Sequence, residues 1–197
     1  MYKLRKREDV RVYFDEIENA HSEASKSWKF VYSWLDSLIF ALAVILVIFT
    51  ALFRVVGVNG KSMVPTLHNG DWLAVRAINT HYSRGDIVVI TQPNKLNEPL
   101  IKRIIAVAGD EVDINFAEGT VKINGKIIDE PYIAEPTNRM FDVAFPVTVP
   151  DGCVFVMGDN RNDSLDSRST IIGFIDQRYL FGKAGLRLFP FGEWKID

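Results

Sequence analysis

The sequence predicts a mainly β protein, in which one N-terminal transmembrane helix is followed by an antiparallel all-β domain. Two observations lead to this fold class. A long apolar run with a single charge occupies the window from Ser37 to Val56, and about 20 such residues are needed to cross the ~30 Å hydrocarbon core of a bilayer. From residue 57 onward the apolar runs are short, rich in β-branched residues and separated by turn residues, which is the pattern of strands.

The first element in chain order is a charged tail. Residues 1–33 carry many charges of both signs, and their hydrophobic periodicity is poor. We therefore expect a cytosolic N-terminal tail that is helical or loosely ordered.

Residues 34–56 are predicted to form the transmembrane helix. The one charge in the apolar window, Arg54, lies near its end, where the aliphatic stem of the side chain reaches the headgroups. Trp28, Tyr32 and Trp34 gather at the other flank like an interfacial belt. A cleaved signal peptide fits less well, because the charged region before the run is long and no small-x-small site follows it. A buried core helix is the other alternative. The cations on the two flanks balance, so they do not fix the orientation.

The domain from 57 to 197 is predicted to be a sandwich or barrel of strands, since no long helical pattern follows the span. Asn124-Gly125 lies between two apolar runs and predicts a two-residue hairpin turn. The expected strands are residues 71–78, 86–91, 100–107, 112–116, 120–123, 126–129, 143–149, 153–157 and 180–189.

Composition argues against several function classes. The formal net charge is −2 and the Arg and Lys residues are scattered, so we expect no nucleic-acid partner. The one cysteine, Cys153, cannot form an internal disulfide or a Cys-rich zinc site. The chain has only three histidines, whereas most hydrolytic triads use a histidine base. We expect neither a metal nor an organic cofactor.

Ser62 is the first candidate for chemistry. It follows directly after the predicted span, in a segment where Gly57 and Gly60 permit tight backbone geometry and Pro65 favours extended conformations. Ser62 is thus expected in a constrained turn close to the bilayer. From composition alone, an ordinary turn serine is the better interpretation, since most serines are surface residues.

Lys102 is the second candidate. Both faces of the expected strand 100–107 are apolar except for the pair Lys102-Arg103, so Lys102 is predicted to be partly buried. Burial lowers the pKa of a lysine, and a neutral amine can act as a general base. The alternative is a pair of edge cations that prevents aggregation.

The third candidate is the polar loop from Gly158 to Arg168. Ser164, Asp166 and Arg168 alternate along it and would lie on one side of an extended stretch, where Asp166 and Arg168 could pair. Such a loop can orient a nucleophile and a base. Alternatively, its polar side chains only form hydrogen bonds within the turns of the loop.

Together the three segments resemble the bacterial type I signal peptidase (leader peptidase) family, whose motifs occur in the same order. The resemblance covers about residues 38–190. The matching segments are S-M-x-P-T-L at 62–67, Lys-Arg at 102–103 followed by Gly-Asp at 109–110, G-D-N-R-x-x-S-x-D-S-R at 158–168, and the further segment at 84–88.

The resemblance implies a serine protease with a Ser62–Lys102 dyad, in which Ser62 is the nucleophile and Lys102 the general base. It implies that Ser164 orients the Lys102 amine. The expected supporting and substrate-binding residues are Asp166 and Arg168, which brace the loop, Arg103 paired with Asp159, and Val58, Met63, Leu67, Leu100 and Ile101 along the substrate. Some family members have Ser or Thr at the position of Gly60, where the hydroxyl helps to hold the oxyanion, so the second oxyanion donor stays open.

The implied function is removal of N-terminal signal peptides from exported preproteins, with cleavage after small-x-small motifs. The implied fold is the complex β fold of signal peptidases with a membrane-associated apolar surface, in a compact version with a small insertion near 110–152. The implied place is the plasma membrane, with a single pass, a cytoplasmic N-terminus and an extracytoplasmic catalytic domain. Its partners would be signal-bearing preproteins and the lipid bilayer.

Three other functions are weaker. A Ser/Lys enzyme could cut itself or one dedicated partner, although no DNA-binding helix pair accompanies it. A membrane-anchored β scaffold would not need the Ser62, Lys102 and 158–168 set. A serine hydrolase could also use His68, six residues after Ser62, as its base.

Overall fold

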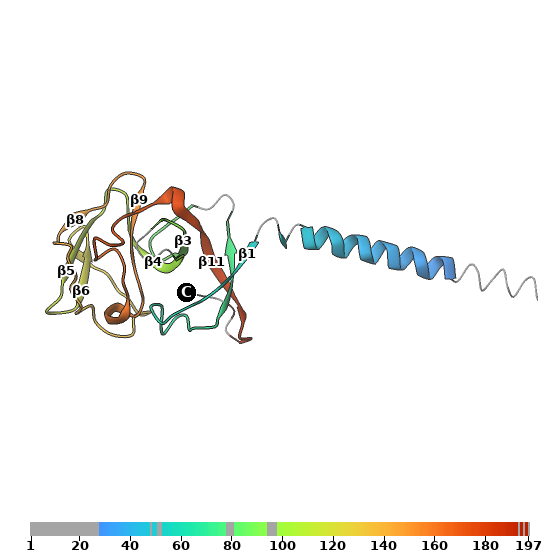
Figure 1. Ribbon diagram of the computed structural model, residues 1–197, viewed down its shortest axis with the longest axis horizontal. Coiled ribbons are helices and arrows are strands. Elements are labelled where there is room, and N and C mark those ends of the chain that lie inside the picture. The colour runs from blue at the N-terminus through green and yellow to red at the C-terminus, as the bar shows by residue number, and fades with distance from the viewer. Residues whose placement is uncertain are drawn as a thin grey trace, which may run out of the picture. The chain divides into compact units, whose positions relative to one another are not determined.

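The computed structural model of the chain describes residues 28–47, 49–50, 53–77, 81–93, 98–192, 194 and 196. It divides into two units, Met1–Ala51 and Leu52–Asp197, each considered by itself (Figure 1). Most of the predicted charged tail, residues 1–27, lies outside the described residues.

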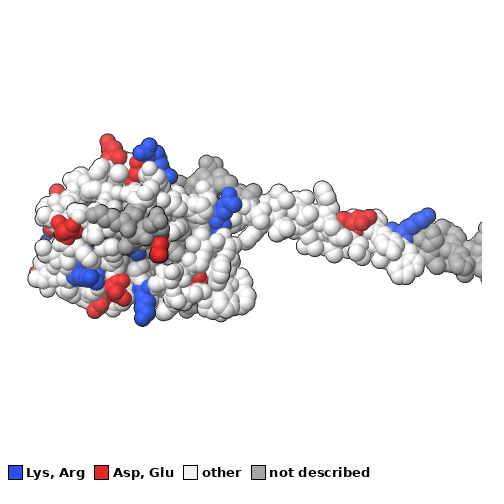
Figure 2. Space-filling model, in the orientation of Figure 1, with Lys and Arg blue, Asp and Glu red and all other residues white. Residues whose placement is uncertain are grey.

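The first unit contains an apolar helix from Trp28 to Val47. It has 20 residues and is exposed throughout, so by length and composition it can cross a membrane. Ser37 donates a hydrogen bond to the carbonyl of Ser33, one turn earlier, which satisfies its hydroxyl without water. Figure 2 shows this helix with very few charged side chains.

The predicted bounds of the helix, 34–56, are wrong at both ends. Trp28 is already helical, and β1 (Phe53–Gly57) is a strand that pairs antiparallel with β2 (Trp72–Arg76). Hydropathy could not separate the two elements, because Val55 and Val56 are as apolar as the helix. Val56 packs against the core of the second unit, so packing on the β unit decides the conformation of these residues.

The second unit consists of two antiparallel sheets, so the fold class predicted from the sequence is confirmed. The larger sheet has the order β1-β2-β11-β3-β4-β9-β10, and the smaller has the order β7-β6-β5-β8. In Figure 1, β5, β6 and β8 lie together at one end of the unit, and β1 and β11 lie at the other. The remaining strands are β3 (Ile87–Ile90), β4 (Leu100–Val107), β5 (Glu111–Asn115), β6 (Thr120–Ile123), β7 (Lys126–Ile127), β8 (Val147–Thr148), β9 (Cys153–Met157), β10 (Ile175–Asp176) and β11 (Leu180–Phe189), with the short 3-10 helices η1 (Arg161–Asp163) and η2 (Gln177–Tyr179).

Each strand expected from the sequence is present, and the smaller sheet occupies the region expected as an insertion. The largest difference concerns the strand predicted at 143–149, of which only β8 pairs with a neighbouring strand. The hairpin predicted at Asn124-Gly125 joins β6 to β7, and both residues have positive φ, 52° and 76°. That combination is the requirement of a type I′ turn.

Two buried clusters position the site. The first includes Ile105 and Phe155 of the larger sheet together with Val112 and Val121 of the smaller, so it joins the two sheets. The second lies under the serine segment and includes Met63, Leu67, Leu73, Val75, Ile87 and Val89. Packing in these clusters holds the ends of the loops that carry the polar residues described below.

Candidate active site

Ser62 lies in the loop between β1 and β2, and buried neighbours fix its place. Met63 is 2% exposed and Leu67 is fully buried, both in the cluster beneath the loop. Gly60 has a φ of 105°, and its N–H donates to Asn69 Oδ1 over 2.9 Å. Leu67 therefore belongs to the core, and it does not line the cavity in which the resemblance placed it as a substrate contact.

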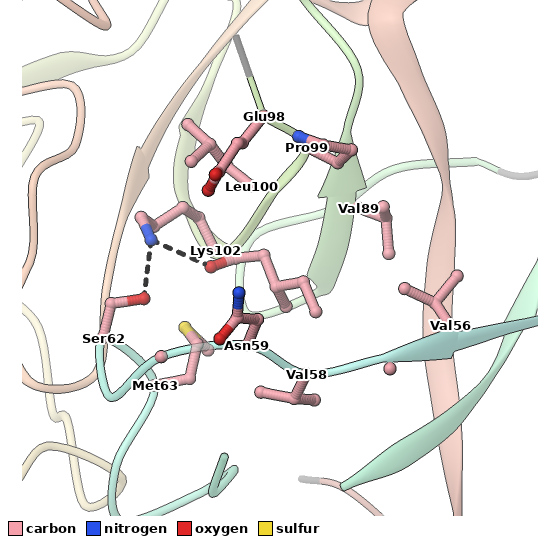
Figure 3. A pocket seen from close by; sticks show the side chains of 13 residues that line it. Val56, Val58, Asn59, Ser62, Met63, Val89, Glu98, Pro99, Leu100 and Lys102 are labelled. Carbon is pink, nitrogen blue, oxygen red and sulfur yellow. Dashed lines mark hydrogen bonds between the residues drawn. The ribbon is translucent and has the colours of Figure 1, made fainter. Parts of the chain in front are cut away.

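Lys102 lies within β4, which is covered on both edges by β3 and β9. Its residue surface is only 3% exposed, as the sequence predicts. Its Nζ donates to Ser62 Oγ over 2.7 Å and to the carbonyl oxygen of Ile101 over 3.1 Å. Figure 3 shows the two side chains pointing toward each other at one end of a cavity.

The environment of Lys102 lowers the pKa of its amine. Burial lowers its pKa from the ordinary 10.5 to about 8, although the negative charges of Asp166 and Asp159 oppose the shift. A lysine with this pKa is neutral in a useful fraction of molecules near neutral pH and can accept a proton from a bonded hydroxyl.

Asp159 connects three segments that are distant in the sequence. Its carboxylate accepts two hydrogen bonds from the Arg103 guanidinium, over 2.9 and 2.8 Å, and one from the Thr66 hydroxyl. This is the ion pair that the family resemblance implies. Both side chains of the pair are nearly inaccessible, and bidentate geometry is the strong form of such a contact. The Tyr132 ring lies 3.9 Å from the guanidinium carbon of Arg103 and covers it.

The loop from Gly158 to Arg168 is held by a second buried ion pair. Arg168 donates two hydrogen bonds to Asp166, over 2.8 and 2.9 Å, and neither side chain is exposed. Asp166 also accepts the N–H of Gly158, over 3.0 Å. The next residues of the loop support the serine directly, because the N–H of Asn160 donates to the carbonyl oxygen of Ser62 over 3.0 Å.

Ser164 does not hydrogen-bond to the Lys102 amine in this structure. Its Oγ is buried and has no hydrogen-bond partner among the described residues. It packs against Gly158, where an added Cβ would lie 2.3 Å from Ser164 Oγ and 2.4 Å from the carbonyl oxygen of Ser62. The close packing explains why glycine occupies position 158.

A cavity of about 290 Å³ opens beside Ser62 and Lys102. Its walls are two short stretches of chain, one running on from β1 and the other leading into β4 (Figure 3). Of the substrate contacts expected from the sequence, it contains Val58, Met63, Leu100 and Ile101. The lining residues not anticipated are Val56, Gly57, Asn59, Val89, Glu98 and Pro99.

The Ser62 hydroxyl accepts a hydrogen bond from Lys102 Nζ, which favours Lys102 over His68 as its partner. No group of three or more His, Cys, Asp and Glu side chains within the described part of the chain could hold a metal ion.

Comparison with known proteins gives a consistent family. The family model "Signal peptidase, peptidase S26" matches residues 31–189. The chain is 38% identical to signal peptidase I of Bacillus licheniformis over 174 residues, which are 83% of this chain and 91% of that protein. It is 35% identical to signal peptidase I S of Bacillus subtilis (strain 168) over 185 residues, which are 88% of this chain and 97% of that protein.

A solved signal peptidase I from Enterococcus faecalis V583 is 30% identical, and it superposes with a TM-score of 0.45 over 53% of this chain and 97% of that one. The family model spans most of the chain, and the relatives match over nearly their whole length. The chain therefore belongs to the signal peptidase family, peptidase S26.

Proposed function

We propose that this protein is a membrane-bound serine endopeptidase that removes N-terminal signal peptides from exported preproteins, with Ser62 as nucleophile and Lys102 as general base. Family membership supports the substrate class. The observation that carries the mechanism is the 2.7 Å hydrogen bond between a buried lysine amine and the Ser62 hydroxyl at one end of a cavity.

In the proposed reaction, neutral Lys102 takes the proton of Ser62 as Ser62 Oγ attacks the scissile carbonyl. The resulting ammonium returns the proton to the leaving amine, and an acyl-enzyme remains. Lys102 then activates a water molecule that hydrolyses the ester. The carbonyl of Ile101 holds the amine during both steps. The orienting role that the resemblance implies for Ser164 has no hydrogen bond to Lys102 behind it in this structure.

The oxyanion is proposed to be held first by the N–H of Ser62. Gly60 has no hydroxyl, and its N–H is already used by Asn69, so the second donor must come from another residue or from water. The carbonyl of Ser62 is tied to Asn160, which fixes the orientation of the peptide that follows.

The substrate is proposed to bind as an extended segment between residues 56–60 and 98–101, the two stretches that wall the cavity. Main-chain hydrogen bonds from such stretches give affinity, and pockets between alternate side chains give specificity. Small pockets near Val58, Met63 and Ile101 would admit small residues at the first and third positions before the cut.

The proposed topology is a single span in the plasma membrane, with the N-terminus in the cytoplasm and the catalytic unit on the extracytoplasmic side. The apolar helix from Trp28 to Val47 supports the span. The direction rests on the proposed reaction, because signal peptides are cut after the chain that follows them has crossed the membrane.

The function is tested with the full chain in detergent and a preprotein that carries an Ala-x-Ala cleavage site. Wild-type protein should release the mature form, and Ser62→Ala should reduce the rate by at least about a thousandfold, since it removes the nucleophile. N-terminal sequencing of the product locates the cut. An intact preprotein after incubation with wild-type protein in native lipid would overturn the proposed function and favour one dedicated substrate.

The cleavage rate should depend on pH through Lys102. Since only the neutral amine accepts the serine proton and its pKa is about 8, kcat/KM should rise as pH increases and become constant above that pKa. Well below it, the rate should fall about tenfold per pH unit. The measurement is kcat/KM from roughly pH 6 to roughly pH 10, on a substrate without titrating groups near the cut. A flat profile would contradict Lys102 as the base.

Gly158→Ala should lower kcat/KM by about a hundredfold while most of the fold remains. The added methyl group would overlap both Ser164 Oγ and the carbonyl oxygen of Ser62, so the serine must move, and displacements of about 1 Å cost about this much. Gly185→Ala is the matched control, because no atom lies within 4 Å of its added Cβ. Equal activity of the two variants would show that the packing at Gly158 does not position Ser62.

A further inference from the structure

A second cavity lies away from the dyad, on the outer face of β1, β2 and β11. Antiparallel register places Phe53 opposite Arg76 and Arg76 opposite Lys183. Residues directly opposite in such a ladder project from the same face. The neighbours Leu73 and Val75 project from the other face into the core, so the row of Phe53, Arg76 and Lys183 faces outward.

This cavity has a volume of about 490 Å³ and combines cationic with apolar walls. Arg76, Lys183 and His81 supply nitrogen donors, and none of the described residues that line the cavity carries a carboxylate. Lys183 Nζ does contact Asp86, at 2.5 Å, but 42% of the Lys183 side chain is exposed, and an ammonium has three donors. The described residues that line the cavity are Phe53, Ala74, Arg76, His81, Lys183, Gly185 and Leu186.

The same face becomes apolar along the strands. Register places Val55 in one row with Leu186, through Ala74, and Trp72 opposite Phe189. Each of these four large side chains is about half exposed, between 42% and 53%. Trp72 is four residues from Arg76, which is about 13 Å along a strand. Cationic side chains therefore lie at the border of an exposed apolar surface. This arrangement matches the boundary between the acyl chains and the headgroups of a bilayer.

One wall of the cavity also lies close in sequence to the apolar helix. Phe53 follows the end of the apolar helix, Val47, by six residues, which span at most about 20 Å when fully extended. This step rests on the membrane span of the proposed function.

We propose that the cavity between β1, β2 and β11 binds the phosphate group of an anionic phospholipid. The Arg76 guanidinium and the Lys183 ammonium match a phosphate in charge and in donors. The apolar walls of Phe53 and Leu186 suit the glycerol and the start of the acyl chains, which a free phosphate lacks. Basic pockets between transmembrane helices bind anionic headgroups by the same charge complementarity. A zwitterionic choline lipid brings a cation of its own, which Arg76 and Lys183 repel.

The test uses native mass spectrometry of the full chain in non-ionic detergent, titrated with phosphatidylglycerol or with phosphatidylcholine of the same acyl chains. Wild-type protein should bind phosphatidylglycerol at least about fivefold more tightly, and Arg76→Gln/Lys183→Gln should remove this preference. Arg76→Gln alone keeps the Lys183–Asp86 contact and should show an intermediate loss, so a folding defect of the double variant does not decide the result. Lys122→Gln/Lys126→Gln removes the same charge from the smaller sheet and should keep the wild-type preference.

Four outcomes would overturn the proposal. They are no lipid preference in the wild type, an unchanged preference in the Arg76/Lys183 variant, an equal loss in the Lys122/Lys126 control, and displacement of the lipid by inorganic phosphate at equal concentration, which would indicate a free-phosphate site. Cleavage of the preprotein in detergent is measured in parallel. The Arg76 and Lys183 variants should retain it, so failure of the lipid site and failure of the proposed peptidase function give different results.

Discussion

Lys102→Met is expected to lower preprotein cleavage by at least about a thousandfold without unfolding the protein. The substitution removes the amine that is bonded to Ser62 Oγ and with it the only base that the proposed reaction uses. Methionine fits the buried position, which is 3% exposed, and carries no charge that needs solvent. The melting temperature should therefore be equal to or higher than that of the wild type. Rates are measured as kcat/KM on the same preprotein.

Two further variants separate a base from a positioning cation. Lys102→Arg keeps a positive charge near Ser62, but a guanidinium is not deprotonated in proteins, so it should be as inactive as Lys102→Met. Lys122→Met, on β6, removes a lysine from the smaller sheet and should leave the rate unchanged. Substantial activity of Lys102→Arg would show that charge, and not proton transfer, is what the reaction needs from this residue.

Arg168→Met is expected to have the largest effect on stability, a loss of about 3–5 kcal/mol in the free energy of unfolding. Asp166 is fully buried, so removing the guanidinium leaves a carboxylate without its cation and without solvent. The hydrogen bond from Arg168 to the carbonyl of Arg161 is lost as well. Urea unfolding of the full chain in detergent, followed by tryptophan fluorescence, measures the change.

The chain contains its own control for this experiment. Asp176 and Arg178 form an ion pair with the same sequence spacing as Asp166 and Arg168, but the Arg178 side chain is 84% exposed. Arg178→Met should leave the unfolding midpoint unchanged, because exposed pairs are screened by water and salt. If both variants shift the midpoint equally, burial of the Asp166–Arg168 pair is not what stabilises the loop.

The parts of the site that depend on local pattern could be predicted from the sequence. A strand that is apolar on both faces predicts burial for any residue within it, and Lys102 is buried for this reason. Alternation in the 158–168 loop puts Asp166 and Arg168 on one side, where they form an ion pair. The hairpin at Asn124-Gly125 follows equally directly from the demand for positive φ.

The remaining features depend on contacts between distant segments, which one sequence does not reveal. Val55 and Val56 of β1 are as apolar as the helix before them, and their pairing with β2 makes them part of a strand. Leu67 belongs to the serine motif, yet its side chain packs in the core and does not line the cavity. Glu98 and Val89 line the cavity only because the chain around β3 and β4 returns to the end of β1.

The Asp159 junction makes the site a product of the complete fold. Its carboxylate holds Thr66, 93 residues earlier, and Arg103, 56 residues earlier. During synthesis the ribosome makes Ser62 and Lys102 long before it makes the residues that brace them. A nascent or truncated chain therefore carries both reactive groups without their fixed geometry. Because this geometry needs Asp159 and the strands that follow it, we expect peptidase activity only after the C-terminal part of the unit has folded.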